Sequence, residues 1–149
     1  MPEEGAEIMN LTPDFSEAMD FSPFPDATYL CKVVDISAFQ SKPSSPNPGG
    51  IKMIEWTFMI EDDKEYTSVT DGSKQNVRGR QMFRNTPAEG KGAGFLRSML
   101  QALKYDETKF RLPDSKLELV GRKLYITTKL DNGTSPPRNK PDSWKPAAN

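Results

Sequence analysis

Alternation of apolar and polar residues is clearest between Ile51 and Glu61. A period of two is typical of a strand with one face in the core and the other in solvent. The residues that we expect on the core side are Ile54, Trp56, Phe58 and Ile60. This pattern predicts a half-buried strand in which the side chains of Trp56 and Phe58 pack in the core and do not contact a ligand.

Residues 65–70 are a candidate for a short additional strand, and three other segments have the composition of full strands, at 28–39, 77–84 and 123–130. In the last of these, apolar residues on one face alternate with Lys123, Tyr125, Thr127 and Lys129 on the other. The segment 41–50 holds three prolines and two glycines, which predicts a loop. From residue 135 onward the chain is too rich in proline for a strand to be predicted.

One helix is predicted between the arginine-rich segment 77–84 and the strand at 123–130. Thr86-Pro87-Ala88-Glu89 has the form of a capping box with proline at the first helical position. The apolar stripe that follows consists of Phe95, Leu96, Met99, Leu100 and Leu103. Glycines at 90, 92 and 94 leave the start of this helix open.

This order of elements predicts a mainly β fold. We expect a small OB-fold-like five-stranded barrel with one α-helix between the third and fourth strands. The fifth strand is not identified by the pattern. The predicted organisation is an acidic flexible leader at 1–26, a barrel domain at 27–134 and a basic proline-rich tail at 135–149.

Charge is distributed unevenly along the 149 residues, although the formal net charge is only −1. Residues 1–26 hold seven acidic and no basic side chains, so the remainder holds all 20 Lys and Arg against 14 acidic residues. The balance of +6 in that remainder favours a polyanion as partner. No apolar run is long enough to span a bilayer, and no signal peptide is recognisable, so we expect a protein of the cytoplasm with no membrane contact.

The residues that usually carry catalysis or bind metals are scarce. The chain has no histidine and one cysteine, Cys31, which excludes a disulfide framework and removes the best zinc ligands. Acidic residues cluster between Glu61 and Glu65, but adjacent acids at a hairpin tip are usually a solvated turn. We therefore expect no enzyme, no catalytic residue, no metal and no cofactor.

Arginines at positions 78, 80 and 84 fall at i, i+2 and i+6, so in a strand they share a face with Met82. A row of guanidinium groups suits a row of phosphates. The alternative is a solvated face with ordinary surface arginines. Lys91, among the glycines before the helix, can hold one further backbone phosphate with the free N–H groups of the helix start. The alternative is that these glycines simply allow a close turn between the strand and the helix.

The polar face of the strand at 123–130 predicts a stacking platform. Tyr125 lies between Lys123 and Lys129, an arrangement that suits a stacked base with flanking phosphate contacts. The alternative is a partly buried tyrosine beside snorkelling lysines. Trp144 in the basic tail is a second stacking candidate, with packing of the tail as its alternative. Phe83 is a third, although it alternates away from the arginines and toward the core.

Several short motifs resemble those of phage-encoded single-stranded DNA-binding proteins of the OB-fold. Phe21 to Tyr29 is similar to the leader of that family, and Ile54 to Phe58 to its tryptophan-containing strand before an acidic turn. The other similar segments are Gly79 to Phe83, Phe95 to Leu103 and Leu119 to Leu124. The resemblance extends over roughly residues 21–130 in order.

This resemblance implies non-enzymatic coating of single-stranded DNA, with little sequence preference, in phage replication or recombination in the host cytoplasm. A homodimer is one arrangement that it allows. Two features differ from the family: a proline-rich segment replaces the final strand, and the tail is basic where many members end in an acidic, partner-recruiting tail. Recruitment of replication or recombination proteins is then expected of leader 1–26. The alternative function is a structural or adaptor protein of a phage particle, with the barrel used for protein contacts.

Overall fold

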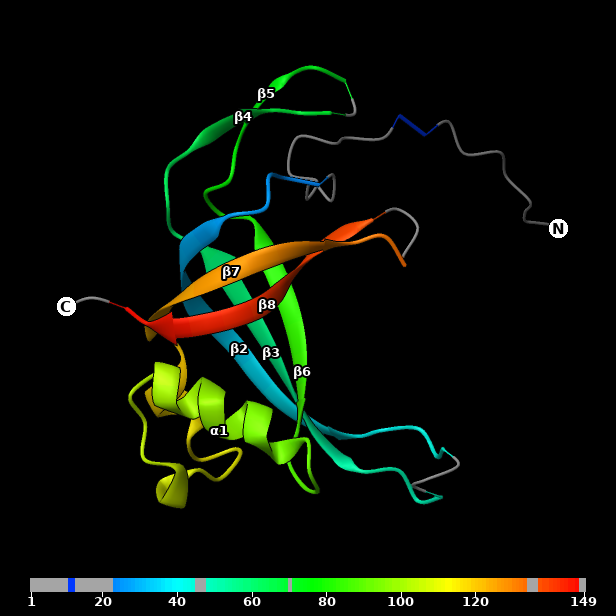
Figure 1. The fold of residues 1–149 in the computed structure, drawn as a ribbon, viewed down its shortest axis with the longest axis vertical. Helices are drawn as coiled ribbons and strands as arrows, with labels where there is room; N and C mark the ends of the chain where they lie inside the picture. Colours follow the sequence, from blue (N-terminus) through cyan, green and yellow to red (C-terminus); the bar gives the residue numbers. More distant parts are fainter. Residues whose placement is uncertain (1–10, 13–22, 45–47, 70, 134–136, 148–149) are drawn as a thin grey trace, which may run out of the picture.

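Five antiparallel strands form the main sheet of the protein, in the order β6-β3-β2-β7-β8 (Figure 1). The computed structural model describes residues 11–12, 23–44, 48–69, 71–133 and 137–147. The strands of this sheet are β2 (Thr28–Gln40), β3 (Lys52–Ile60), β6 (Gln81–Pro87), β7 (Lys123–Asp131) and β8 (Arg138–Pro146). The predicted mainly β class is therefore confirmed, and the main sheet has five strands, which pair antiparallel.

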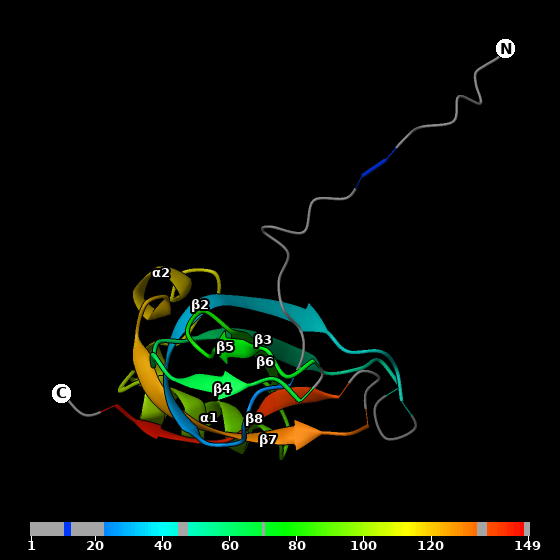
Figure 2. The same ribbon diagram turned by 90° about the horizontal axis from the view of Figure 1, so that it is seen from above.

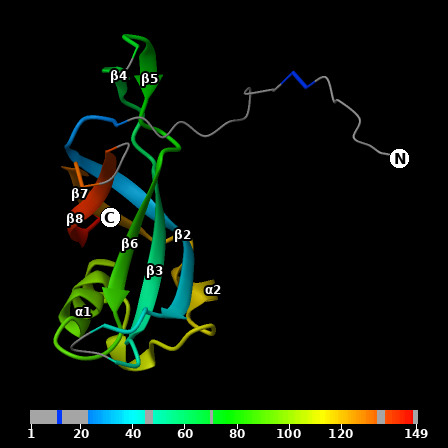
Figure 3. The same ribbon diagram turned by 90° about the vertical axis from the view of Figure 1, so that its right-hand side faces the viewer.

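The smaller elements lie at the two ends of this sheet. A two-stranded hairpin, β4 (Glu65–Thr67) and β5 (Lys74–Asn76), projects above it. Helix α1 (Ala93–Ala102), the 3₁₀ helix η1 (Glu107–Lys109) and the short helix α2 (Lys116–Leu119) lie at the opposite end. Figures 2 and 3 show that β7, β8 and α1 lie to one side of the β6–β3–β2 layer. The core is enclosed between them.

The expected closed barrel is not formed. β6 and β8 are the edge strands of the sheet and share no ladder, although they approach closely enough for the Arg84 side chain to reach the Pro141 carbonyl. Proline has no N–H to donate, so Pro141 and Pro146 weaken β8 as a ladder partner. Side chains fill the space between the two edges instead.

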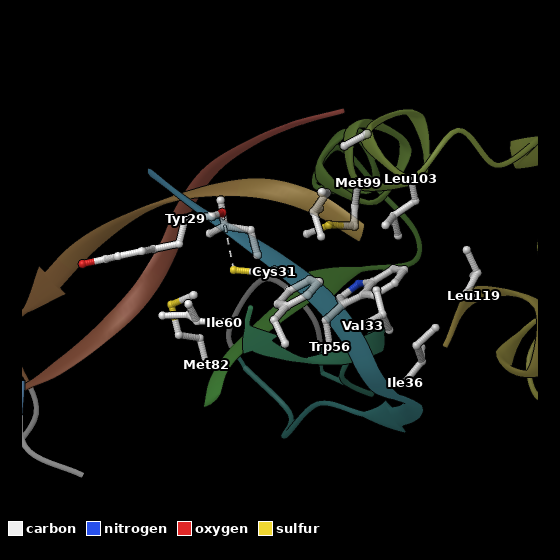
Figure 4. Packing of buried hydrophobic residues seen from close by; sticks show 14 of the residues in the cluster. Tyr29, Cys31, Val33, Ile36, Trp56, Ile60, Met82, Met99, Leu103 and Leu119 are labelled. Atoms are coloured by element: carbon white, nitrogen blue, oxygen red, sulfur yellow. Dashed lines mark hydrogen bonds between the residues drawn. The ribbon is translucent and has the colours of Figure 1, made fainter. Parts of the chain in front are cut away.

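Trp56 lies at the centre of the core and is completely buried (Figure 4). Its ring stacks against Phe58 at 6.0 Å and against Phe110 at 6.5 Å between centroids. The indole N–H donates to the Thr86 hydroxyl across the β3–β6 pair at 2.9 Å. The four core residues predicted for β3 are all buried, as are Leu124 and Ile126 of β7.

The helix begins later than the capping-box pattern predicts. α1 starts at Ala93, while Thr86 and Pro87 are the last residues of β6. The pattern was wrong because Thr86 uses its hydroxyl as the acceptor for Trp56, inside the core. Glu89 likewise accepts from the Lys52 backbone N–H and not from a helix start.

The missing fifth strand lies in the proline-rich segment. β8 pairs with β7 from Leu124↔Pro146 to Asp131↔Arg138, with an irregularity between Thr127 and Thr128. An edge strand needs hydrogen bonds on one side only, which is why it tolerates prolines that a central strand does not. Most of the predicted leader, residues 1–10 and 13–22, lies outside the described residues.

Thr86→Val should lower the free energy of unfolding by about 1–3 kcal/mol, because it leaves the buried Trp56 N–H without an acceptor at nearly unchanged volume. Thr57→Val, on the outer face of β3, is the matched control and should change stability little. Denaturant unfolding measures both variants. Equal stability of the two would show that this hydrogen bond contributes nothing.

Candidate nucleic-acid interface

The three arginines of the predicted row do not form one open face. Arg78 lies in the turn before β6 and is exposed, and its backbone N–H donates to the Asn76 side chain. Arg80 also precedes β6; its guanidinium lies 4.9 Å from the Phe24 ring centre and donates to the Tyr66 hydroxyl at 2.6 Å. Arg80 therefore anchors the base of the β4–β5 hairpin to the chain before β2.

Arg84 closes the space between β6 and β8. Its guanidinium lies 5.4 Å from the ring centre of Phe95 on α1 and 5.3 Å from that of Trp144 on β8. It donates to the Pro141 carbonyl at 3.3 Å, while its buried Nε has no hydrogen-bond partner. We call Arg84, Phe95 and Trp144 the seam. Trp144 also donates to Ser98 of α1 at 2.9 Å, so the seam joins three elements.

The parity of β6 explains this placement. Arg84 does share a face with Met82, as the spacing predicts, but Met82 is buried, so that face is the inner one. Phe83, which the pattern turned toward the core, is on the outer face next to Thr57 and is 48% exposed. The expectation that Phe83 faces the core was wrong. Met82 is apolar and shares a face with Arg84, and this could have indicated from the sequence that their face is the inner one.

Tyr125 stands beside an open pocket of about 550 Å³, which we call the Tyr125 hollow. The side chains of Leu124 and Ile126 are buried, so Lys123 before them and Tyr125 between them face outward. The lining residues are Leu30, Ala102, Leu103, Lys104, Gly121, Arg122, Lys123, Tyr125 and Ala147. Three of these are cations, one is aromatic and none is acidic.

Two further charged groups act close to the hollow. Lys145 is the cross-strand neighbour of Tyr125, and its ammonium lies 5.6 Å from the centre of the tyrosine ring. Glu61 lies 3.5 Å from the Lys123 ammonium and 3.9 Å from that of Lys32. One carboxylate thus compensates two of the lysines, and the surface around the hollow keeps a net positive charge.

The other two predicted phosphate contacts lie elsewhere. Lys129 is exposed nearer the opposite end of β7, beside Lys140 of β8, whose ammonium lies 3.7 Å from the Asp131 carboxylate. Lys91 is exposed in the turn before α1, whose N-cap residue Gly92 provides no side-chain cap. The structure therefore brings Lys123 and Tyr125 together, but neither Lys91 nor Lys129 lines their hollow.

Sequence reasoning missed three cations near Tyr125. Lys104 follows α1, Arg122 precedes β7 and Lys145 lies in β8. Each belongs to a different element, so no sequence spacing links them. Only Arg122 could have been connected with the site from the sequence, because it is adjacent to Lys123.

Cys31, the one cysteine of the chain, is buried. Burial, with smaller contributions from Asp62 and Glu61, raises the pKa of the Cys31 thiol to about 12, so it stays protonated near neutral pH. Within the described ranges, no three His, Cys, Asp or Glu residues gather as metal ligands do, and no helix has the length and apolar character needed to cross a bilayer. No protein-family model and no curated protein matches this chain.

Arg84→Lys should lower the free energy of unfolding by about 1–2 kcal/mol, because an ammonium cannot stack its plane on both Phe95 and Trp144. The Trp144 emission should change with it. Denaturant unfolding and tryptophan fluorescence measure these two effects. Arg78→Lys is the control, and a seam variant as stable as that control would contradict a structural role for Arg84.

Proposed function

We propose that this protein is a non-enzymatic single-stranded DNA-binding protein that binds with little sequence preference. The observation that carries the proposal is the Tyr125 hollow, which combines an outward-facing tyrosine with Lys104, Arg122 and Lys123 and has no acidic lining residue. Stacking on an aromatic ring together with cations along the backbone is how proteins hold single strands without reading their sequence.

The strand order supports an OB-type fold as part of this proposal. β2, β3 and β6 form a meander, α1 follows, and the β7–β8 hairpin pairs back onto β2. The OB-fold is a five-stranded, partly open Greek-key barrel, and an unpaired β6–β8 boundary is compatible with that description. OB-folds commonly bind oligonucleotides and oligosaccharides, and the cationic lining of the hollow favours the former.

A single strand suits the hollow better than a duplex does. Tyr125 is half-buried and faces outward from β7, and an aromatic ring in such a place can stack with a base that is already unstacked. Lys123 lies two residues before Tyr125 on β7, and the ammonium of Lys145 lies over the Tyr125 ring, 5.6 Å from its centre, so both cations are near the backbone phosphates of such a base. In a duplex the base faces are covered by their neighbours.

The charge distribution and the family resemblance suggest the biological setting. Residues 27–149 hold an excess of six positive charges, which supports a polyanionic partner. The motifs in 21–130 resemble those of phage proteins of replication and recombination, and we propose that setting here. The acidic leader 1–26 is the proposed contact for a replication or recombination protein.

A second function is favoured by the outer face of β3 and β6. Phe83 is 48% exposed there, and Phe39, beside Met53 at the end of the β2–β3 pair, is 40% exposed. Apolar groups on a sheet face suit a protein contact better than a phosphate backbone. A structural or adaptor protein of a phage particle, with this face against another subunit, is therefore the alternative.

Tyr125→Ala should weaken binding to oligo-dT by about 1–3 kcal/mol, because it removes the stacking surface and leaves the surrounding cations in place. Fluorescence anisotropy of a labelled strand at fixed salt measures the loss. Phe83→Ala is the matched control, an aromatic truncation at an exposed site away from the hollow, and should bind as the wild type does.

The wild-type protein separates the two functions in the same assay. Affinity that falls steeply with added salt, and that is higher for oligo-dT than for a duplex of equal length, is expected for single-strand binding. No binding of oligo-dT at low salt would contradict the proposed function and favour the adaptor. A Phe83→Ala loss with an unaffected Tyr125→Ala variant would move the site to the β3–β6 face.

A further inference from the structure

The Tyr125 hollow lies at the C-terminus of α1, an unfavourable place for an anion. The last carbonyl groups of a helix carry partial negative charge and repel a phosphate. α1 has no basic residue in its own last turn that would compensate them. A hollow bounded by Ala102 and Leu103 therefore needs a cation from another element before it can hold a nucleic-acid backbone.

Arg122 supplies that cation from the turn before β7. Its Nη1 donates to the Leu103 carbonyl at 3.2 Å and to the Lys104 carbonyl at 3.3 Å, and its Nε donates to the Glu118 carbonyl at 3.1 Å. The guanidinium also lies 5.2 Å from the ring centre of Tyr105. Most of the guanidinium N–H groups thus donate to the protein itself. Arg122 is therefore poorly placed to bind a phosphate.

Lys104 has an unusual backbone for its residue type. Its φ is +58°, and no other non-glycine residue in the described ranges has a positive φ. Glycine is the usual residue directly after a helix in this conformation, because a side chain there is strained. The Lys104 N–H donates to the Gln101 carbonyl at 3.0 Å, as is common at a helix end. What is unusual is that a lysine, and not a glycine, occupies the position.

The side chain at this position reaches the hollow. Lys104 is exposed and lines the pocket together with Lys123 and Tyr125. Within the described residues no carboxylate lies at ion-pair distance from its ammonium, in contrast to Lys123, which faces Glu61. A strained residue that brings an uncompensated charge to a cationic pocket indicates a function for that charge.

We propose that Lys104 contacts a DNA phosphate in the Tyr125 hollow and that Arg122 is the positioning residue that holds the Lys104 turn in place. This inference rests on the proposed function and assigns separate roles to two cations of the same site. Arg122 neutralises the helix end and fixes the turn, and Lys104 makes the contact.

Lys104→Gly tests the phosphate contact, because it should raise the stability of the protein and lower its affinity for DNA. Glycine relieves the strain at φ +58°, so the melting temperature should rise by about 2–4 °C. The same variant should bind oligo-dT several-fold more weakly, and the slope of log K against log salt should shrink by about 0.7, the contribution of one phosphate on a single strand. Lys109→Ala, an exposed lysine in η1 outside the hollow, is the control and should leave the salt slope unchanged.

The double variant tests the role of Arg122. If Arg122 makes no phosphate contact of its own, Lys104→Gly combined with Arg122→Gln should have the same salt slope as Lys104→Gly alone, since the one phosphate contact is already lost. An independent phosphate contact by Arg122 would instead add its own loss and shrink the slope by about 1.4 in total. Should Arg122→Gln fail to fold, Arg122→Lys removes the paired hydrogen bonds while keeping the charge, and the same non-additivity is expected.

The outcomes distinguish this inference from the proposed function. Wild-type protein that fails to bind oligo-dT would overturn the function itself. Wild-type binding that depends on Tyr125, with a Lys104→Gly variant of unchanged affinity and slope, would overturn the phosphate contact alone. A salt slope smaller by about 1.4 in the double variant would overturn the positioning role of Arg122.

Discussion

The hydrogen bond from the Trp56 indole to the Thr86 hydroxyl determines which side chains of β6 face the core. With Thr86 turned inward, the period of two along a strand turns Met82 and Arg84 inward and Phe83 outward. A shift of one residue would reverse every side chain of the strand and leave the buried indole without an acceptor. Arg84 therefore serves the interior of this protein, where the sequence pattern had suggested a phosphate-binding face.

The same parity on β7 places the candidate site. Leu124 and Ile126 are buried, so Lys123 and Tyr125 must face outward, in both the predicted strand and the observed one. The arginines and lysines near these strands differ in their contacts. Arg80, Arg84 and Arg122 lie against aromatic rings and hydrogen-bond acceptors of the fold, whereas Lys104 and Lys123 border an open pocket.

Much of the sheet could be predicted because its central strands alternate regularly, as β3 does around Trp56. β8 could not, because an edge strand with hydrogen bonds on one side only can contain Pro141 and Pro146 and lose the composition of a strand. The helix start was misplaced because Thr86 is equally suited to capping a helix and to accepting a core hydrogen bond. Lys123 and Tyr125 of the candidate site lie in one strand, so their position on the same face could be predicted from the sequence. Lys104 and Lys145 come from other elements and meet Tyr125 only in the folded chain.

Photo-cross-linking of the wild-type protein to an oligo-dT strand that carries 5-iodouracil tests the central claim most directly, because the cross-link marks the side chain on which a base rests. Tryptic digestion and mass spectrometry then identify the modified peptide. A base stacked in the Tyr125 hollow should label the peptide of residues 124–129, at Tyr125. Labelling confined to the peptide of residues 81–84, at Phe83, would contradict the account and place the strand on the β3–β6 face.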